Sequence, residues 1–300
     1  MNPIKIAIAA IGGSTLSVIR EIGGVGMLLS EAFVWTFVAP LAGKFPDRKN
    51  MSKQLIEEGI NSIPIVSLLS FTVGMILAMQ TAYNLEKLGA AAFFPTLVAV
   101  AMVRELGPLI ASIIISGRVG AAIAAELGTM VVAEEIDALR TMSLHPNRFL
   151  VVPRVVSLLL MLPCLAMLAN VAGIFGAYLF GATALEMSAA SFKMAAFQYM
   201  TRKDVWTGLL KSGVFSLLIS GISCYRGLSV TGGAEGVGQA TTQSVVHSIF
   251  AIILVDGIFI SVRRWGRPFG CVDAVRRRLG MRVAHHERCG AVAASSVTGR

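Results

Sequence analysis

The sequence predicts an all-α integral membrane protein, and its composition already indicates this class. Hydrophobic residues make up 55% of the 300 residues, charged residues only 14%, and the mean hydropathy is +0.73. A soluble domain carries roughly a quarter charged residues. The formal net charge of +9 comes from basic residues that sit beside apolar runs and in a C-terminal tail, as is typical of membrane flanks. We therefore expect a membrane protein and no nucleic-acid partner.

Five apolar runs are long enough to cross about 30 Å of hydrocarbon as helices. They cover residues 63–82, 95–117, 154–186, 204–225 and 245–262. The third run is long, but it cannot hold two spans and a turn, since each span needs about 20 residues. We therefore expect one tilted helix there, and Asp204 is a plausible N-cap for the fourth helix.

The chain divides into three predicted parts. In the N-terminal segment, 1–54, apolar residues recur at helical spacing over 15–43, which predicts an amphipathic helix in the membrane interface, with a further transmembrane helix as the alternative. A permease-like core of spans covers 55–262. The basic tail, 263–300, is predicted to be poorly ordered.

Charged residues inside the apolar runs are candidate functional residues. The second run carries the ionic pair Arg104-Glu105 together with Pro108, and a lipid-facing helix would not accept these residues easily. We expect them to face protein or a cavity. Lys211 lies in the fourth run and Asp256 in the fifth, and for Asp256 a hydrogen bond between helices is the favoured role.

Small residues follow the second run at intervals that permit close contact between helices. Gly120, Ala124 and Gly128 form one small-xxx-small row, and Gly117 lies on the same segment. We expect ordinary helix packing within one subunit at these positions.

A short acidic segment occupies residues 130–142. Glu134, Glu135 and Asp137 are placed to complement the positive end of a helix, and Asp137 can pair with Arg140. The apolar residues of the segment are predicted to form one stripe: Val132, Ile136, Leu139 and Met142. The pattern predicts a short amphipathic helix in an aqueous loop, with a solvated connector as the alternative.

The positive-inside rule places this loop on the cytoplasmic side, because arginines surround it at positions 118, 140, 148 and 154. This location favours a docking helix for a soluble motor. Three predicted spans follow the loop, so the arginine-rich tail is expected outside, against the usual distribution of positive charge. We interpret the tail as an external extension that contacts anionic lipid headgroups, and the alternative is that the fifth run does not cross the membrane.

Ordered motifs run from the second to the fifth apolar run. They are Arg104-Glu-Leu-Gly-Pro-Leu109, Gly117-Arg-Val-Gly-Ala-Ala-Ile-Ala-Ala-Glu-Leu-Gly-Thr129, Glu134-Glu-Ile-Asp-Ala-Leu139, Pro146-Asn-Arg-Phe-Leu-Val-Val-Pro-Arg154, Cys224-Tyr-Arg-Gly-Leu228 and Ala240-Thr-Thr-Gln-Ser-Val-Val246. Together they resemble the signatures of the MlaE (YrbE-like) permeases of Mce-type ABC lipid transporters, over about residues 55–262.

The resemblance implies a particular assembly. Two permease copies pair in the inner membrane, each docks a cytoplasmic ABC ATPase that binds ATP and Mg²⁺, and MCE-domain proteins sit on the outer side. Phospholipid moves through a pocket between the permeases. The chain itself is then a non-catalytic subunit without a cofactor.

The resemblance also assigns roles to residues. Arg104 and Glu105 match the ionic element near the lipid pocket. Weaker pocket candidates, for which helix packing is the alternative, are Gln80, Tyr83, Leu106 and Lys211. The coupling helix corresponds to Glu134, Glu135, Ile136, Asp137 and Leu139.

Other activities lack their usual motifs. The glycine-rich segment 232–238 has no lysine for a phosphate loop and is interpreted as a cytoplasmic turn. The sequence contains neither an HExxH nor a CxxC motif, so no metal site is indicated. A secondary transporter of a small hydrophobic solute would show two repeated halves, and an intramembrane enzyme would need a paired acid or a nucleophile with its base. Both remain as alternatives. Neighbouring genes for a Walker-type ATPase and an MCE protein would favour the permease.

Overall fold

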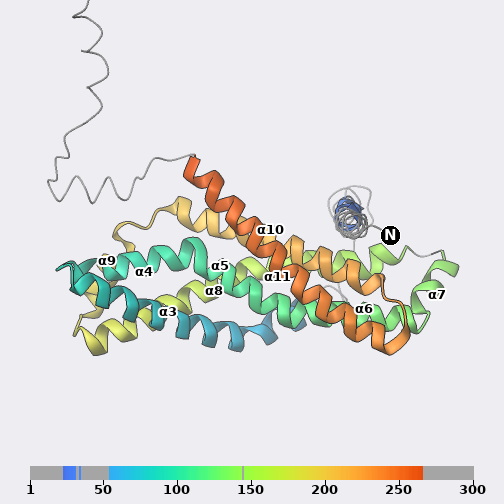
Figure 1. Ribbon diagram of the computed structural model, residues 1–300, viewed down its shortest axis with the longest axis horizontal. Helices are drawn as coiled ribbons and strands as arrows, with labels where there is room; N and C mark the ends of the chain where they lie inside the picture. Colours follow the sequence, from blue (N-terminus) through green and yellow to red (C-terminus); the bar gives the residue numbers. More distant parts are fainter. Residues whose placement is uncertain (1–22, 32–33, 35–53, 144, 266–300) are drawn as a thin grey trace, which may run out of the picture. The chain divides into compact units, whose positions relative to one another are not determined.

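The computed structural model describes residues 23–31, 34, 54–143 and 145–265. In these ranges the secondary structure is helical, without a strand (Figure 1). The chain falls into two compact units, residues 1–256 and 257–300, and the described part of the second unit is the end of one helix. The described residues thus confirm the all-α class.

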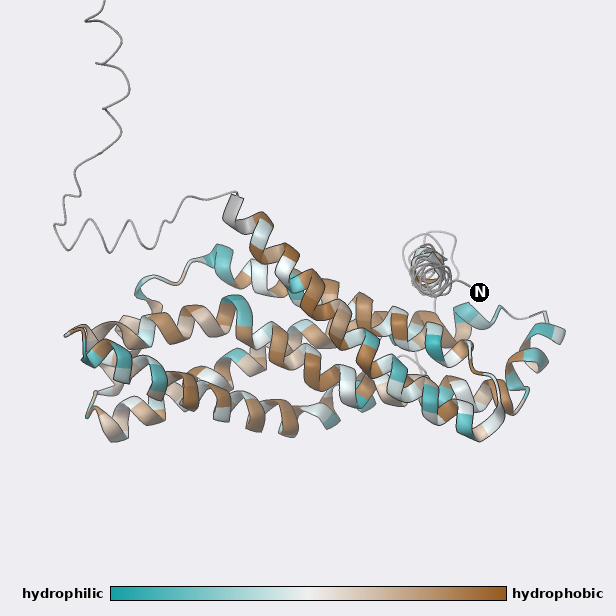
Figure 2. Cartoon of the chain, viewed as in Figure 1, coloured by the Kyte–Doolittle hydropathy of each residue, from teal (hydrophilic) through white to brown (hydrophobic). Residues whose placement is uncertain are grey.

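Five helical stretches of the described residues are long and apolar enough to cross a membrane. They are Gln54–Glu86, Phe94–Val132, Asn147–Ala184, Arg202–Leu228 and Gly233–Val262. Figure 2 shows that hydrophobic residues dominate these helices. Within the described residues, each of the five predicted spans is thus a helix of sufficient length and apolar character, and the protein is a multi-pass membrane protein.

The helices follow one another in a simple order. The first span contains η2 (Ile60–Ser62) and α3 (Ile63–Glu86). The second contains η3 (Ala91–Phe93), α4 (Phe94–Ala101), η4 (Met102–Leu106), α5 (Gly107–Ile115), η5 (Ser116–Gly120) and α6 (Ala121–Val132). After α7 (Glu135–Thr141) come η6 (Asn147–Val151), α8 (Val152–Ala184), α9 (Ala189–Gln198), α10 (Arg202–Leu228) and α11 (Gly233–Trp265).

The second span is longer than the sequence predicted. It continues without a break past Gly117 to Val132, because two π-helical turns, η4 and η5, join α4, α5 and α6 into one helical path. In η4 the N–H of Gly107 donates to the Met102 carbonyl, five residues back. Pro108 follows immediately and has no N–H to donate, so the regular ladder is interrupted there in any case. π-helical turns of this kind are frequent at functional sites.

The third span is a single helix, as predicted. α8 has 33 residues and contains Pro163 in its interior. At 1.5 Å per residue it is about 50 Å long. Because α7 precedes its start and α9 follows its end, these two short helices lie at opposite ends of α8 (Figure 1).

Glycines allow α3 and α8 to pack with their backbones in contact. A Cβ added at Gly74 would overlap the carbonyl oxygen of Gly173, and one at Gly176 would overlap that of Phe71. Such contacts are typical of membrane helices, which gain no hydrophobic driving force from water and associate through small residues.

Two apolar clusters fill the bundle. The larger combines residues of α5, α6, α8 and α10, such as Ile115, Leu158 and Phe215. The smaller, near α9, includes Phe94, Met102 and Phe192. Arg104 and Glu105 follow Met102 and precede Ala111 of the larger cluster. Along the second span, Arg104 and Glu105 are therefore located between residues of the two apolar clusters.

Two predicted helix starts require correction. α10 begins at Arg202 with Thr201 as N-cap, and Asp204 occupies the third helical position, where its Oδ2 accepts a hydrogen bond from the Thr201 N–H at 3.0 Å. α11 begins at Gly233, so most of the glycine-rich segment is helical and not a turn. The turn itself is made by Gly232 and Gly233, whose φ angles of 90° and 73° suit glycine.

The predictions for the two ends of the chain fall largely on residues outside the described ranges. Of the expected interfacial helix, residues 23–31 are described and helical. They pack on α10, since a Cβ at Gly221 would touch Leu29. They also contact η6, where Asn147 donates a hydrogen bond to Glu31 at 2.7 Å. The interfacial position of this helix and the disorder of the tail beyond Trp265 stay predictions.

Candidate functional site

A cluster of five charged side chains lies inside the bundle. The guanidinium Nε of Arg104 is 2.8 Å from Asp204 Oδ1. The ammonium of Lys211 is 2.5 Å from Glu105 Oε1 and 2.6 Å from Asp256 Oδ1. We call these five residues the ionic cluster. They come from η4 and from the two consecutive helices α10 and α11, which lie far from η4 in the sequence.

Arg104 and Glu105 do not form the ion pair with each other that their adjacency suggested. Among the described residues each has its own partner, Asp204 for the arginine and Lys211 for the glutamate. Neighbouring residues on a helix point in directions that differ by about 100°, so they cannot face each other across it. The sequence neighbours therefore connect η4 to α10 at two points.

Burial differs between the members of the ionic cluster. The side chains of Asp204, Lys211 and Asp256 are 1%, 5% and 10% exposed, whereas those of Arg104 and Glu105 are 33% and 30% exposed. The buried three act as anchors, and the other two reach the surface of this chain. With all groups ionised, two cations face three carboxylates, so the cluster has a formal charge of −1.

Helix α10 presents its part of the cluster on one face. Asp204, Gly208 and Lys211 are spaced i, i+4 and i+7, which places them in one row along the helix. A Cβ at Gly208 would lie 2.6 Å from the Val103 carbonyl oxygen, so only glycine lets α10 approach η4 this closely. This spacing is the signal that could have identified Asp204 as a cluster residue, since its position at the start of the fourth apolar run predicted only a helix cap.

The other pocket candidates lie apart from these ion pairs. Leu106 is half-buried and packs against the smaller apolar cluster. Gln80 and Tyr83 are exposed on α3, where the ammonium of Lys87 lies 4.1 Å from the centre of the Tyr83 ring. Of the weaker candidates, the structure therefore brings only Lys211 into the ionic cluster.

The predicted coupling segment forms α7, between α6 and α8. Ile136 is buried and Leu139 half-buried, whereas Glu134, Glu135 and Asp137 are exposed. Glu134 takes a left-handed conformation (φ 57°) at the helix start. Arg140 pairs with Asp137 at 3.1 Å, as the spacing suggested. Val132 is the last residue of α6 and is exposed, so it is not part of an apolar stripe on α7.

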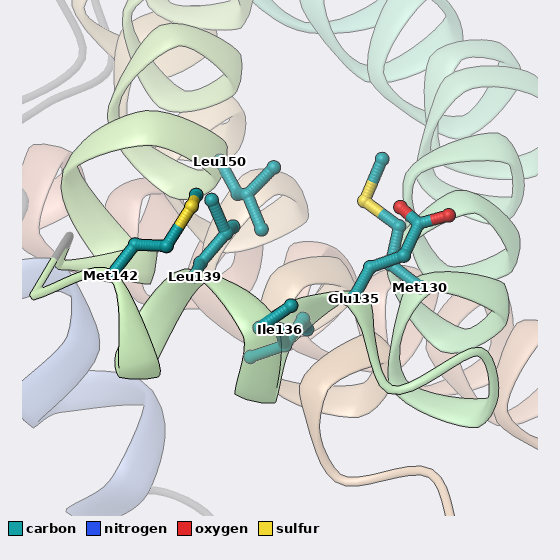
Figure 3. A pocket seen from close by; sticks show the side chains of 7 residues that line it. Met130, Glu135, Ile136, Leu139, Met142 and Leu150 are labelled. Carbon is teal, nitrogen blue, oxygen red and sulfur yellow. The ribbon is translucent and has the colours of Figure 1, made fainter.

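A hollow of about 210 Å³ lies beside α7. Its lining is almost entirely apolar and consists of Met130, Glu135, Ile136, Ala138, Leu139, Met142 and Leu150 (Figure 3). Figure 3 shows Leu139, Met142 and Leu150 side by side, with Glu135 toward Met130. The end of the bundle at α7 thus combines an acidic exterior with an apolar recess.

The small residues of the second span pack against α10 and the residues that follow it. A Cβ at Gly120 would lie 3.0 Å from Ser223 Oγ of α10, and one at Gly128 would lie 2.9 Å from Val230, after the end of α10. Ala124 is fully buried in the same row. Gly117 differs from expectation, because a Cβ there would have no atom of the described residues within 4 Å.

The described residues contain no group of three or more His, Cys, Asp or Glu side chains that could hold a metal ion. Each carboxylate of the ionic cluster is paired with Lys211 or Arg104. The chemistry of the cluster is therefore that of a charged binding surface inside an apolar bundle.

Comparisons with known proteins agree with this architecture. The family described as Permease MlaE matches residues 51–262. A probable ABC transporter permease protein of Rickettsia conorii is 42% identical over 202 residues, 67% of this chain and 78% of that protein. One from Rickettsia bellii is 38% identical over 245 residues, 82% of this chain and 93% of the relative. The chloroplastic protein TRIGALACTOSYLDIACYLGLYCEROL 1 of Arabidopsis thaliana is 36% identical over 213 residues, 71% of this chain and 61% of its own length. The chain therefore belongs to the MlaE permease family.

Proposed function

We propose that this chain is the transmembrane permease subunit of an ABC transporter that moves phospholipids or related hydrophobic lipids. The transporter exchanges lipid between the inner membrane and an MCE-domain partner, and a separate subunit supplies the energy by hydrolysing ATP. The observation that carries the proposal is the ionic cluster, which offers partly exposed charges within membrane-spanning helices.

A phospholipid fits this arrangement because it combines a charged headgroup with apolar tails. Arg104 is oriented by a fully buried carboxylate and still has a third of its side chain exposed, so it can bind a phosphate. Leu106 and the exposed apolar residues of α3 would contact the acyl chains. The name of the Arabidopsis relative contains that of a galactolipid, which supports a lipid as the substrate class.

The relatives' names as ABC transporter permeases support an ATPase partner. We assign its docking to α7, with the buried Ile136 holding the helix in place and Leu139 facing the apolar hollow beside it. ATP and Mg²⁺ would bind to the ATPase and not to this chain. A second copy of the chain would complete the lipid pocket, and an MCE-domain protein would receive or deliver lipid at the opposite end.

Membrane orientation follows from the same assignment. If α7 is cytoplasmic, α9 lies at the outer end of the spans, because α8 separates them by about 50 Å. The basic residues around α7, Arg118, Arg140, Arg148 and Arg154, agree with that side. We therefore place the chain in the inner (cytoplasmic) membrane of the cell.

Purification with the partners tests the function. The chain would be expressed with its ATPase and MCE proteins, purified in detergent, and the bound lipid identified by mass spectrometry. We expect phospholipid in the wild-type complex and less of it in Arg104→Gln, with Arg202→Gln, an exposed arginine of α10 outside the ion pairs of the cluster, as control. Co-purification of a small polar solute in place of lipid would overturn the proposal.

A further inference from the structure

A second group of buried charges lies where α6 and α8 flank α7. Arg154, near the start of α8, has a side chain that is only 4% exposed. Its Nη2 lies 2.7 Å from Glu126 Oε2 of α6, whose side chain is 50% exposed, and its Nη1 donates to the Leu150 carbonyl at 3.2 Å. This ion pair joins the two helices on either side of the predicted coupling helix.

Glu58, at the start of the first span, is a second carboxylate near the same arginine. It is buried, and its Oε2 accepts a hydrogen bond from Ser157 Oγ. Ser157 lies one turn beyond Arg154 on α8, and its hydroxyl also lies 3.1 Å from the Arg154 carbonyl. Glu58 and Arg154 therefore lie on the same side of α8, close enough for their charges to interact.

The two groups leave complementary atoms unsatisfied. Glu58 Oε1 and Arg154 Nε are both buried, and among the described residues neither has a hydrogen-bond partner. A buried donor or acceptor without a partner is costly, and more so when it belongs to a charged group. The arginine instead uses its terminal nitrogens for a half-exposed carboxylate and a backbone carbonyl. One guanidinium thus has two carboxylates within its surroundings and is paired with one of them.

We propose that Arg154 is a two-position switch that exchanges Glu126 for Glu58 when α7 moves. In the structure Arg154 ties α8 to α6. In the second position the guanidinium turns to Glu58, satisfies both unpartnered atoms, and ties α8 to the first span instead. Only the role of the switch rests on the proposed function: it would transmit movement of the docked ATPase to the helices around the lipid.

The surrounding contacts make this exchange mechanically effective. Glu126 and Arg154 are 28 residues apart, with α7 between them, so a displacement of α7 acts directly on their ion pair. On the other side, the start of the first span is anchored, because Arg118 donates to Ser62 Oγ at 2.8 Å and Ser62 donates to the Glu58 carbonyl at 2.7 Å. The first span continues as α3, which packs on α8 through Gly74 and Gly173. A shift of Arg154 would therefore change how α6, α8 and α3 move together.

Spin labels on α6 and α8 test the switch without any transport measurement. We would replace the native cysteines, introduce Thr129→Cys and Leu160→Cys at exposed positions, and attach a nitroxide to each new thiol. The distance between the two labels would be measured by electron paramagnetic resonance on the full chain in lipid nanodiscs. Glu126→Gln removes the present partner, so the distance distribution should shift to longer values. Glu58→Gln removes the alternative partner and should leave a single, shorter population.

Glu57→Gln is the matched control, since it removes the same charge from an exposed neighbour and should leave the distribution unchanged. If Glu126→Gln and Glu58→Gln both reproduce the wild-type distance distribution, or shift it in the same direction, the proposed switch is wrong.

ATP hydrolysis gives a second measurement. With the ATPase bound, the two variants should also change the basal rate of ATP hydrolysis in opposite directions. Equal losses in both would indicate a merely structural role. A chain that shows the distance shifts but moves no lipid would contradict the proposed function and leave the switch intact.

Discussion

Gly208 of α10 packs against the backbone of Val103 in η4, so closely that a Cβ would lie 2.6 Å from the Val103 carbonyl oxygen. This contact brings Asp204 and Lys211, on the same face of α10, within reach of Arg104 and Glu105. The ionic cluster therefore depends on a residue that carries no charge.

Gly208→Val should disrupt the cluster indirectly. The added side chain would push α10 away from η4, cost about 1–3 kcal/mol of stability by overpacking, and lengthen both ion pairs. We expect a lower thermal unfolding temperature and reduced lipid transport. Gly213→Val is the control on the same helix, because a Cβ there reaches only one atom, Leu159 Cδ1, at 4.0 Å. Equal effects of the two substitutions would contradict the role of Gly208.

Lys211→Met should destabilise the chain. It would leave the carboxylates of Glu105 and Asp256 side by side without their shared cation. Removal of one partner from a buried ion pair typically costs about 3–5 kcal/mol, and the partial exposure of Glu105 places the expected loss toward the lower end. Thermal unfolding in detergent would measure it, with Lys193→Met on the exposed surface of α9 as control.

Glu105→Gln tests the role of the partly exposed carboxylate. Asp256 still neutralises Lys211 in this variant, so assembly with the partners should be retained while lipid transport decreases. The more drastic Glu105→Arg should also impair transport, but it would place a third cation beside Lys211 and so reduce stability as well. If both reconstituted variants, Glu105→Gln and Glu105→Arg, transported lipid at the wild-type rate, the assignment of Glu105 to the lipid pocket would be wrong.

The double substitution Ile136→Asp and Leu139→Asp should uncouple the ATPase. Both side chains line the apolar hollow beside α7, and the residues that line it include no cation that could pair with a carboxylate. We expect the ATPase to be lost during affinity purification of the double variant. Met194→Asp, an exposed position on α9 at the other end of α8, should retain it. Retention of the ATPase by the 136/139 variant would show that docking does not use α7.

The location of the C-terminus can be tested by proteolysis. Three spans follow α7, so a cytoplasmic α7 places the tail on the outer side. A C-terminal tag should then be protected when protease is added to sealed inside-out membrane vesicles, and become accessible after detergent treatment. Cleavage in the intact vesicles would mean that one of the five apolar helices does not cross the membrane.

Much of the architecture follows from local sequence. Hydrophobic runs such as 63–82 and the unbroken α8 are long enough to determine the number of spans, because transfer of each residue into an apolar environment depends mainly on its own side chain. The family also follows from ordered local motifs. The helix boundaries were less predictable. The second span reaches Val132 through π-helical turns, and α11 includes the glycines from position 233, because packing against other helices overrides local propensity.

The partners of the charged residues were decided by tertiary structure alone. The sequence identified Arg104, Glu105, Lys211 and Asp256 as unusual for a membrane helix, and it suggested that the first two pair with each other. In the structure they pair with residues of α10 and α11, and Asp204 joins them. Whether a residue tolerates the membrane is a property of its own side chain. The charge that neutralises it depends on which helices become neighbours, and this in turn depends on contacts such as that of Gly208 with Val103.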